Sequence, residues 1–208
     1  HTVRLSLRQR IGDIIDEMNY VPNRLAGGLA GSHSGLVGVI VTSLFNSEFA
    51  AILDTLQQDL AARGMQVMIG NSAYDPEEEL RLVRAMLSWR PAAIAIVGTN
   101  HHPRVAALLA QAEVPIVEFW DATDVAIDTS IGMDHRRIGR DQCRHLVDGG
   151  CVRLAFVGSV RAHDYRAQKR LAGVHDFARR SLGHKVAVEI STEPGSPALG
   201  ARLADTLL

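Results

Sequence analysis

The sequence predicts an α/β fold in which parallel strands form doubly wound sheets with helices on both faces. Strand-sized segments such as Leu36–Val41 and Ala92–Val97 are continuously apolar. Strands of this kind are buried on both faces, whereas a strand with one face in water alternates apolar and polar residues. Segments with apolar residues at three- and four-residue spacing separate them, and this alternation of strands and helices is typical of parallel sheets.

The composition is that of a folded protein without a general affinity for polyanions or bilayers. The chain has 208 residues, of which 47% are hydrophobic and 22% charged, so it can bury a sizeable core. Its net charge is −1, so any contact with nucleic acid or an anionic membrane has to come from a local element. The apolar runs are far shorter than the roughly 18 residues needed to cross a bilayer. The sequence therefore predicts no membrane partner.

Two short helical segments precede the first strand. Apolar residues recur at helical spacing between Ser6 and Met18, which predicts a helix with one buried stripe and Ser6 as its N-cap. Pro22 then opens a second segment of about residues 23–30, since proline suits the first turn of a helix. Glycines at positions 27 and 28 each cost about 1 kcal/mol against alanine in a helix, so we expect this segment to be mostly coil on its own. Residues 31–35 have the composition of a linker.

The remaining residues alternate between strands and helices in chain order. The expected strands cover residues 36–41, 66–71, 92–98, 114–120, 152–158 and 185–190. The expected helices cover residues 48–63, 103–112, 134–147 and 165–180, and two more begin near residues 76 and 196. We assign residues 36–149 to a first lobe and residues 150–208 to a second one. The second lobe has too few units to match the first, so we expect the natural protein to continue beyond Leu208.

Loops at the carboxyl ends of the strands are the expected ligand-binding region of such a sheet. They cover residues 42–49, 71–75, 98–102, 118–121 and 159–170. Their polar and aromatic side chains are Phe45, Asn46, Phe49, Ser72, Thr99, Trp120, Arg161, Tyr165, Arg166 and Arg170. Hydroxyls, amides and aromatic rings suit a polyol, and a guanidinium matches a carboxylate or phosphate. The sequence thus favours a sugar acid, although each single arginine could equally be a solvated charge on a helix.

Catalytic and metal-binding patterns are missing from the sequence. It holds no GxSxG, P-loop, HExxH or GxGxxG after the first strand. His101 and His102 are neighbours whose side chains would diverge on most backbones, and the acids from Asp75 to Glu79 fit a helix N-terminus. We therefore expect no catalytic residue, no metal and no cofactor. Cys143 and Cys151 form no CxxC motif and no secretory signal is visible, so we expect reduced thiols in the cytoplasm.

The ordered motifs resemble the lactose/galactose-repressor (LacI/GalR) family of bacterial transcription regulators. They are RQRIGDIIDEMNYVPNRLAGGLAG, GVIVTSLFNSEFAAIL, GNSAYDPEEE, RPAAIAIVGT and HLVDGGCVRLAFVG, and they run along essentially the whole chain. Within that family, VPIVEFWDATDVAID and DYRAQKRLAG are most similar to the gluconate-utilisation repressors. The resemblance implies two lobes of the periplasmic-binding-protein type, the second one incomplete. It places the last helix of a helix-turn-helix headpiece at residues 1–20 and a hinge helix with its linker at residues 21–35.

For the hinge, the resemblance implies a helix that forms on operator DNA. Leu29 matches the leucine that wedges open a base step in the minor groove, although it could instead pack the hinge against its own headpiece. Tyr20, Asn23 and Arg24 match positions that approach the DNA backbone. Family hinges usually carry a basic residue and a small polar one before the leucine, and often a basic residue after it, where this chain has Gly27, Gly28 and Ala30. Fewer cations release fewer counterions, so we expect weaker and less salt-sensitive hinge binding than is typical.

For the effector, Arg170 matches the cleft arginine of the family, and Arg166 lies one helical turn earlier on the same face. Arg137 falls where relatives can place an effector contact. Phe49 matches an aromatic that flanks the effector, but its helical spacing fits the core equally well. The resemblance implies a homodimeric repressor of gluconate or related sugar-acid catabolism that binds operator DNA and is not an enzyme. The alternative is a periplasmic-type sugar-binding protein of a transport system.

Overall fold

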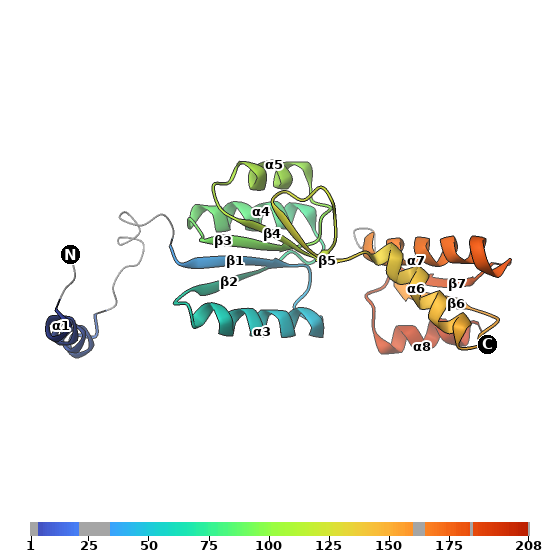
Figure 1. Cartoon of the computed structure of the whole chain (residues 1–208), viewed down its shortest axis with the longest axis horizontal. Coiled ribbons are helices and arrows are strands. Elements are labelled where there is room, and N and C mark those ends of the chain that lie inside the picture. Colours follow the sequence, from blue (N-terminus) through green and yellow to red (C-terminus); the bar gives the residue numbers. More distant parts are fainter. Residues whose placement is uncertain (1–3, 21–33, 160–164, 184, 208) are drawn as a thin grey trace.

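The computed structural model describes residues 4–20, 34–159, 165–183 and 185–207 (Figure 1). The hinge residues Asn23, Arg24 and Leu29 lie outside the described residues, and their predicted roles stay predictions. The described residues form a helix near the N-terminus and two α/β lobes, as expected from the sequence.

The first lobe is built on a five-stranded parallel sheet. Its strand order is β2-β1-β3-β4-β5. The strands are β1 (Leu36–Val41), β2 (Gln66–Asn71), β3 (Ala93–Val97), β4 (Ile116–Asp121) and β5 (Thr129–Met133). In the centre of the sheet Val39 pairs with Ile69 on one side and with Ala95 on the other. The continuously apolar strands therefore lie in the middle of the sheet, where both faces are covered.

Helices cover both faces of this sheet (Figure 1). Helix α3 (Ser47–Ala61) packs on one face, and helices α4 (Pro76–Ser88) and α5 (Pro103–Gln111) pack on the other. Two apolar clusters result, one around Val39, Val41, Phe49 and Leu53, and one around Ile40, Val83, Ile94, Ile96 and Val105. Side chains of Asn46, Asp75 and His102 accept hydrogen bonds from the first-turn N–H groups of the three helices. These caps fix where each helix begins, next to the carboxyl end of a strand.

Strand β5 was not expected from the sequence. Its residues, TSIGM, are neither continuously apolar nor regularly alternating, and most of them are exposed. Pairing along the edge of β4 holds the strand in the sheet. The strand therefore forms because it pairs with β4, and its own residue pattern does not predict it.

The second lobe comprises two parallel strands and the helices packed against them, and it includes residues 135–148, which the sequence-based boundary at residue 149 assigns to the first lobe. Its elements are α6 (His135–Asp148), β6 (Ala155–Ser159), α7 (Tyr165–Phe177), a π-helical turn η1 (Ala178–Leu182), β7 (Ala187–Ser191) and α8 (Pro197–Asp205). Cys143, Val174 and Phe177 belong to its apolar core. Cys143 is buried and Cys151 exposed, and both thiols are free.

Helices α6 and α7 approach so closely that two glycines are required between them. A Cβ on Gly139 would lie 2.1 Å from the carbonyl oxygen of Arg170, and a Cβ on Gly173 would lie 2.0 Å from that of Arg136. Both distances are far below any van der Waals contact. The two backbones therefore touch, and no side chain separates the helices.

Helix α1 (Leu5–Glu17) differs from the sequence prediction in two respects. Arg4 precedes its first turn without a side-chain cap, so the assignment of Ser6 as N-cap is wrong. The apolar stripe predicted to be buried is exposed: no residue of α1 is buried among the described part of the chain, and Leu5 is 84% exposed. Within the described residues, no helix has the length and apolar character needed to cross a membrane.

Candidate functional site

A cavity of about 310 Å³ lies where the carboxyl ends of the first-lobe strands meet the start of α7. Its lining residues are Thr42, Ser72, Tyr74, Asp75, Pro76, Glu79, Val97, Asn100, His101, His102, Tyr165, Arg166 and Gln168. Both lobes thus contribute to one polar site, at the edge of the sheet that the sequence predicts. The Thr42 hydroxyl is buried and has no hydrogen-bond partner among the described residues, so a ligand hydroxyl can pair with it.

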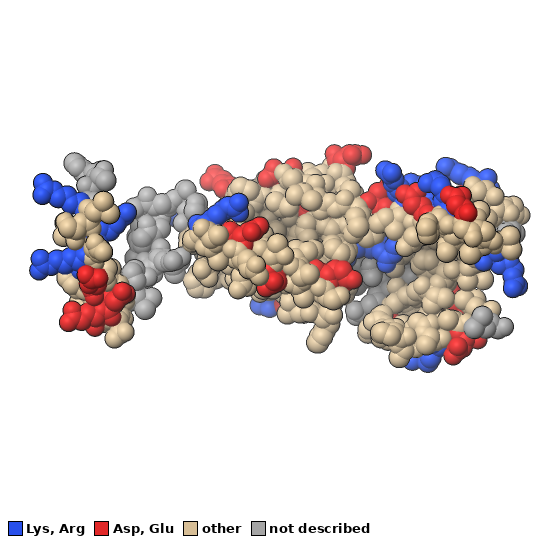
Figure 2. Space-filling model, turned by 60° about the horizontal axis from the view of Figure 1, so that its bottom comes forward, with Lys and Arg blue, Asp and Glu red and all other residues tan. Residues whose placement is uncertain are grey.

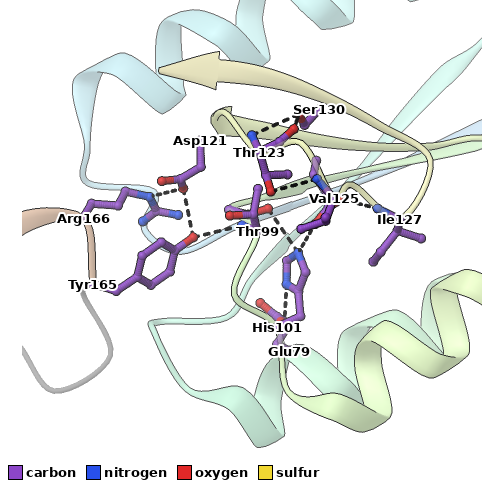
Figure 3. Close-up of polar contacts among 12 residues, drawn as sticks. Glu79, Thr99, His101, Asp121, Thr123, Val125, Ile127, Ser130, Tyr165 and Arg166 are labelled. Carbon is purple, nitrogen blue, oxygen red and sulfur yellow. Dashed lines mark hydrogen bonds and ion pairs between the residues drawn. The ribbon is translucent and has the colours of Figure 1, made fainter. Parts of the chain in front are cut away.

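An ion pair crosses from one lobe to the other beside this cavity (Figure 3). Asp121, the last residue of β4, is 1% exposed, and its Oδ2 accepts from Arg166 Nε at 2.7 Å. The Tyr165 hydroxyl donates to the same oxygen at 2.9 Å. Both donors come from the first turn of α7, so this carboxylate connects the end of β4 to the second lobe.

The Tyr165 hydroxyl is itself held by the first lobe. The Thr99 backbone N–H donates to it at 2.9 Å, from the loop that follows β3. This approach requires a glycine at position 98, where φ is +98° and a Cβ would lie 2.5 Å from the Tyr165 hydroxyl oxygen. Burial raises the pKa of Tyr165, the nearby Arg166 lowers it by less, and the neighbouring Asp121 raises it further. The tyrosine is therefore a neutral donor to Asp121.

Arg170 points to His135 rather than into the cavity. Its Nη1 lies 3.0 Å from His135 Nδ1, and His135 Nε2 lies 3.5 Å from Asp121 Oδ1. Burial lowers the pKa of His135; the nearby Asp121 opposes this, and the cations of Arg170 and Arg166 add to the lowering. A neutral ring that accepts from Arg170 at Nδ1 carries its proton on Nε2, facing Asp121.

A second buried cluster surrounds His101 in the cavity wall (Figure 3). Its Nδ1 lies 3.0 Å from Glu79 Oε1, and its Nε2 lies 3.1 Å from the Gly98 carbonyl oxygen and 3.4 Å from Glu118 Oε1. Because acceptors face both ring nitrogens, the geometry favours the doubly protonated imidazolium. Burial alone would lower the pKa of His101, but the hydrogen bond and charge of Glu79 and the charge of Glu118 together raise it.

Backbone conformations around the site are unusual for residues with side chains. Ala73 and Tyr74, between β2 and α4, have φ values of 51° and 63°, and Trp120 has a φ of 82°. Positive φ values in such residues cost about 1–3 kcal/mol each and occur often at functional sites. Tyr74 lies in the loop after β2 and lines the cavity, and Trp120 directly precedes Asp121 at the end of β4.

The structure brings some of the predicted effector residues together and separates others. Ser72 and Arg166 line the cavity, and Thr99 adjoins it through its backbone N–H. Phe49 and Trp120 pack edge to face with ring centroids 5.1 Å apart, in the apolar cluster under α3. Arg137 is exposed and pairs with Asp141 on α6, and Tyr20 is exposed at the end of α1.

Sequence reasoning did not propose Glu79, His101, Asp121 or His135 as site residues, and it also missed lining residues such as Thr42 and Asn100. Asp121 lies at the carboxyl end of β4, within the loop range 118–121 expected from the sequence, and that position was a usable signal. Glu79 is the last of several acids at a helix start and turns inward to His101, which periodicity does not reveal. His101 and His102 do diverge, since His102 caps α5. Among the described residues, no three His, Cys, Asp or Glu side chains are placed to hold a metal ion.

Comparison with known proteins places the chain in a family. Residues 34–193 match the model of periplasmic binding proteins and the sugar-binding domain of the LacI family. The chain belongs to the LacI family. It is 30% identical over 157 residues to the HTH-type transcriptional regulator GntR of Escherichia coli K12, covering 76% of this chain and 47% of that protein. The chain is also 30% identical over all 208 residues to the GntR regulator of Pseudomonas aeruginosa, of which it covers 60%.

A solved structure agrees with this assignment. A LacI-family transcriptional regulator from Silicibacter pomeroyi superimposes with a TM-score of 0.90 at 32% identity. The match covers 100% of this chain and 62% of that one. This chain thus spans about half to three fifths of the length of such LacI-family regulators. The resemblance to the LacI/GalR family and the α/β fold class, both predicted from the sequence, are confirmed.

Proposed function

We propose that this chain is part of a cytoplasmic transcription regulator that binds operator DNA as a homodimer and represses genes of sugar-acid catabolism. The effector, gluconate or its phosphate, binds in the cavity between the lobes. The observation that supports this most directly is the cavity itself, because it combines the buried Thr42 hydroxyl, further polar side chains and Arg166 at the boundary of two lobes. The similarity of the chain to GntR regulators supports a sugar acid as the class of effector.

Polyol recognition follows from the lining residues. Thr42, Ser72 and Asn100 supply hydroxyl and amide groups, and Asp75 and Glu79 supply carboxylate acceptors. Sugar hydroxyls both donate and accept, so a mixed lining satisfies them. Arg166 supplies the cation that suits an acid group. Arg170 and Arg137 can contact the effector only if the site rearranges, because Arg170 faces His135 and Arg137 faces Asp141.

Regulation requires that effector binding and DNA binding favour different arrangements of the lobes. The cavity is lined from both lobes, so a ligand in it contacts both at once and changes the preferred angle between them. In the proposed mechanism that angle decides whether two hinges, with Tyr20, Asn23, Arg24 and Leu29, meet in one minor groove. Gly27 and Gly28 raise the cost of ordering the hinge and lower its DNA affinity.

Binding assays on the full-length protein test this function. We expect a shift of a palindromic operator fragment in an electrophoretic mobility assay, and a change of that shift when gluconate is added. Calorimetry against gluconate, 6-phosphogluconate and glucose identifies the effector class. Tight sugar binding without any DNA binding would favour the transport-type alternative, and chemical turnover of the sugar would contradict the assignment as a regulator.

The hinge is tested separately by Leu29→Ala. If Leu29 wedges a base step, the variant binds operator at least about tenfold more weakly, since it loses the burial of a leucine side chain, about 1.5–3 kcal/mol. Effector affinity measured by calorimetry stays unchanged, because the cavity is intact. Unaltered operator affinity would instead support packing of Leu29 against the headpiece.

A further inference from the structure

We propose that Asp121 determines whether the inter-lobe cavity prefers acidic or neutral ligands, by neutralising Arg166. This inference rests on the proposed function in that it concerns the same effector site. It concerns a residue outside the cavity lining, because Asp121 lies behind Arg166 and contacts it from the end of β4.

Arg166 is the arginine among the described lining residues, and its charge is already balanced. Its Nε donates to Asp121 Oδ2 at 2.7 Å, and the two side chains are only 6% and 1% exposed. Water screens such a buried pair little, so the carboxylate offsets most of the field that the guanidinium projects into the cavity.

The other cation in the cavity wall is balanced as well. His101 lies between Glu79 and Glu118, whose carboxylate oxygens are 3.0 and 3.4 Å from its ring nitrogens. Asp75 adds a further carboxylate to the lining, where it caps α4. His102 also lines the cavity, and its Nδ1 accepts the Arg104 N–H. The cavity is therefore not cationic overall, and the acid preference depends on how much of the Arg166 charge Asp121 leaves uncompensated.

Asp121 is well placed for this effect because the fold holds it. Arg166 and Tyr165 both donate to its Oδ2, and His135 Nε2 lies near its Oδ1. Asp121 is not among the residues that line the cavity, so its carboxylate acts on charge without contacting the ligand. Removing its negative charge strengthens the binding of anions and leaves the binding of neutral polyols nearly unaltered.

The test measures the ratio of gluconate affinity to glucose affinity by calorimetry on the full-length protein. We expect Asp121→Asn to raise this ratio about tenfold or more, since a unit charge removed within several ångströms in a poorly screened site has that effect. The control Asp141→Asn removes a carboxylate that pairs with Arg137 and Arg144 on the surface of α6. It leaves the ratio unchanged. If the role of Asp121 were purely structural, Asp121→Asn would weaken the binding of gluconate and of glucose to a similar extent.

A second variant covers the case in which Asp121→Asn destabilises the protein by removing the buried carboxylate that faces Arg166. The double variant Asp121→Asn with Arg166→Gln removes both buried charges and leaves Asp75 and Glu79 in the lining. We expect its ratio to fall below that of the natural protein, so that the ratio is highest in Asp121→Asn and lowest in the double variant. A ratio that stays unchanged in Asp121→Asn, or that rises above the natural value in the double variant, overturns the inference.

The two proposals fail in different ways. If the natural protein binds gluconate and regulates its operator but Asp121→Asn leaves the ratio unchanged, only the inference is overturned. If the natural protein prefers glucose and Asp121→Asn gains gluconate binding, the inference holds and the sugar-acid assignment is wrong.

Discussion

At the scale of single residues, the site depends on groups whose roles are set by their partners. Arg166 and Arg170 lie one turn apart on α7, and sequence reasoning assigned them the same role. The structure gives them different partners, Asp121 and His135. Hydroxyl and arginine positions at strand ends could be predicted from the sequence because the sheet rule selects those loops. The buried acids that pair with them could not, since partner choice depends on contacts between distant segments.

Gly98 provides one test at this scale. Gly98→Ala places a methyl group 2.5 Å from the Tyr165 hydroxyl oxygen, on a residue with a φ of +98°. We expect a loss of about 1–3 kcal/mol in the free energy of unfolding, measured by urea denaturation. Gluconate affinity falls as well, because the methyl group pushes Tyr165 and Arg166 from their places. The control Gly64→Ala also has a positive φ but has nothing within 4 Å, so it isolates the backbone contribution.

His101 provides a second test, through pH. Its pKa is raised in the folded protein from the ordinary value of 6.5 by Glu79 and Glu118, against the effect of burial. The charged ring therefore contributes stability that is fully present below pH 6.5 and is lost as the pH rises through the folded-state pKa. In NMR titrations of the ring we expect Glu79→Gln to lower the His101 pKa. An unchanged pKa would mean that Glu79 does not stabilise the protonated ring of His101.

At the scale of elements, the sequence predicts most helices and strands because local patterns and caps agree with the fold. Pro76 and Pro103 begin α4 and α5, and Asp134 and Ser196 cap α6 and α8. Strand β5 was missed because edge pairing, not its own pattern, forms it. The end of the predicted helix at residues 165–180 becomes the π-helical turn η1, which no periodicity signals.

Helix α1 shows an unfavourable charge arrangement for a free helix (Figure 2). Arg4 and Arg8 lie near its start, and Asp13, Asp16 and Glu17 lie toward its end. Both groups oppose the helix dipole, which favours acids at the N-terminus and bases at the C-terminus. With its apolar residues exposed as well, α1 gains little stability from its own turns. This agrees with the proposal that it is one helix of a larger headpiece.

Asp176 lies on α7 and pairs with arginines of α6, so a variant at this position tests the contact between the two helices. Arg136 Nε donates to it at 2.6 Å, Arg179 also donates to it, and Arg140 Nη1 lies 3.8 Å away. The hydrogen bond from Arg136, with smaller contributions from Arg179, lowers the pKa of Asp176 from 3.8 to about 2. The stability that it contributes is present above pH 3.8 and is lost as the pH falls toward 2.

We therefore expect Asp176→Asn to lower the melting temperature at pH 7, and the difference from the natural protein to shrink as the pH approaches about 2. Calorimetric melts at several pH values measure both. The surface variant Asp141→Asn serves as the matched comparison and changes stability by about 0.5 kcal/mol or less. Equal melting temperatures for the Asp176 variant and the natural protein at pH 7 would show that the cluster does not hold the helices together.

At the scale of the whole molecule, two lobes with separate cores share one polar boundary. The hydrogen bond from Tyr165 to Asp121 and the one from the Thr99 N–H to Tyr165 join loops of the first lobe to α7. We expect Tyr165→Phe to reduce the effect of gluconate on operator affinity. The loss is up to about 1 kcal/mol, the contribution of one hydrogen bond, out of a coupling of about 1–3 kcal/mol.

Fluorescence anisotropy of labelled operator, with and without gluconate, measures that coupling. Gluconate affinity in the absence of DNA is determined in parallel, so that weaker binding is not mistaken for weaker coupling. A coupling equal to that of the natural protein would indicate that the lobes communicate through other contacts.

The backbone contact between α6 and α7 has a mechanical consequence. Because Gly139 and Gly173 leave no side chain between the helices, neither helix can roll or slide over the other without a collision. We therefore expect a displacement of α7 at the ligand site to carry α6 with it, because the two backbones are in direct contact.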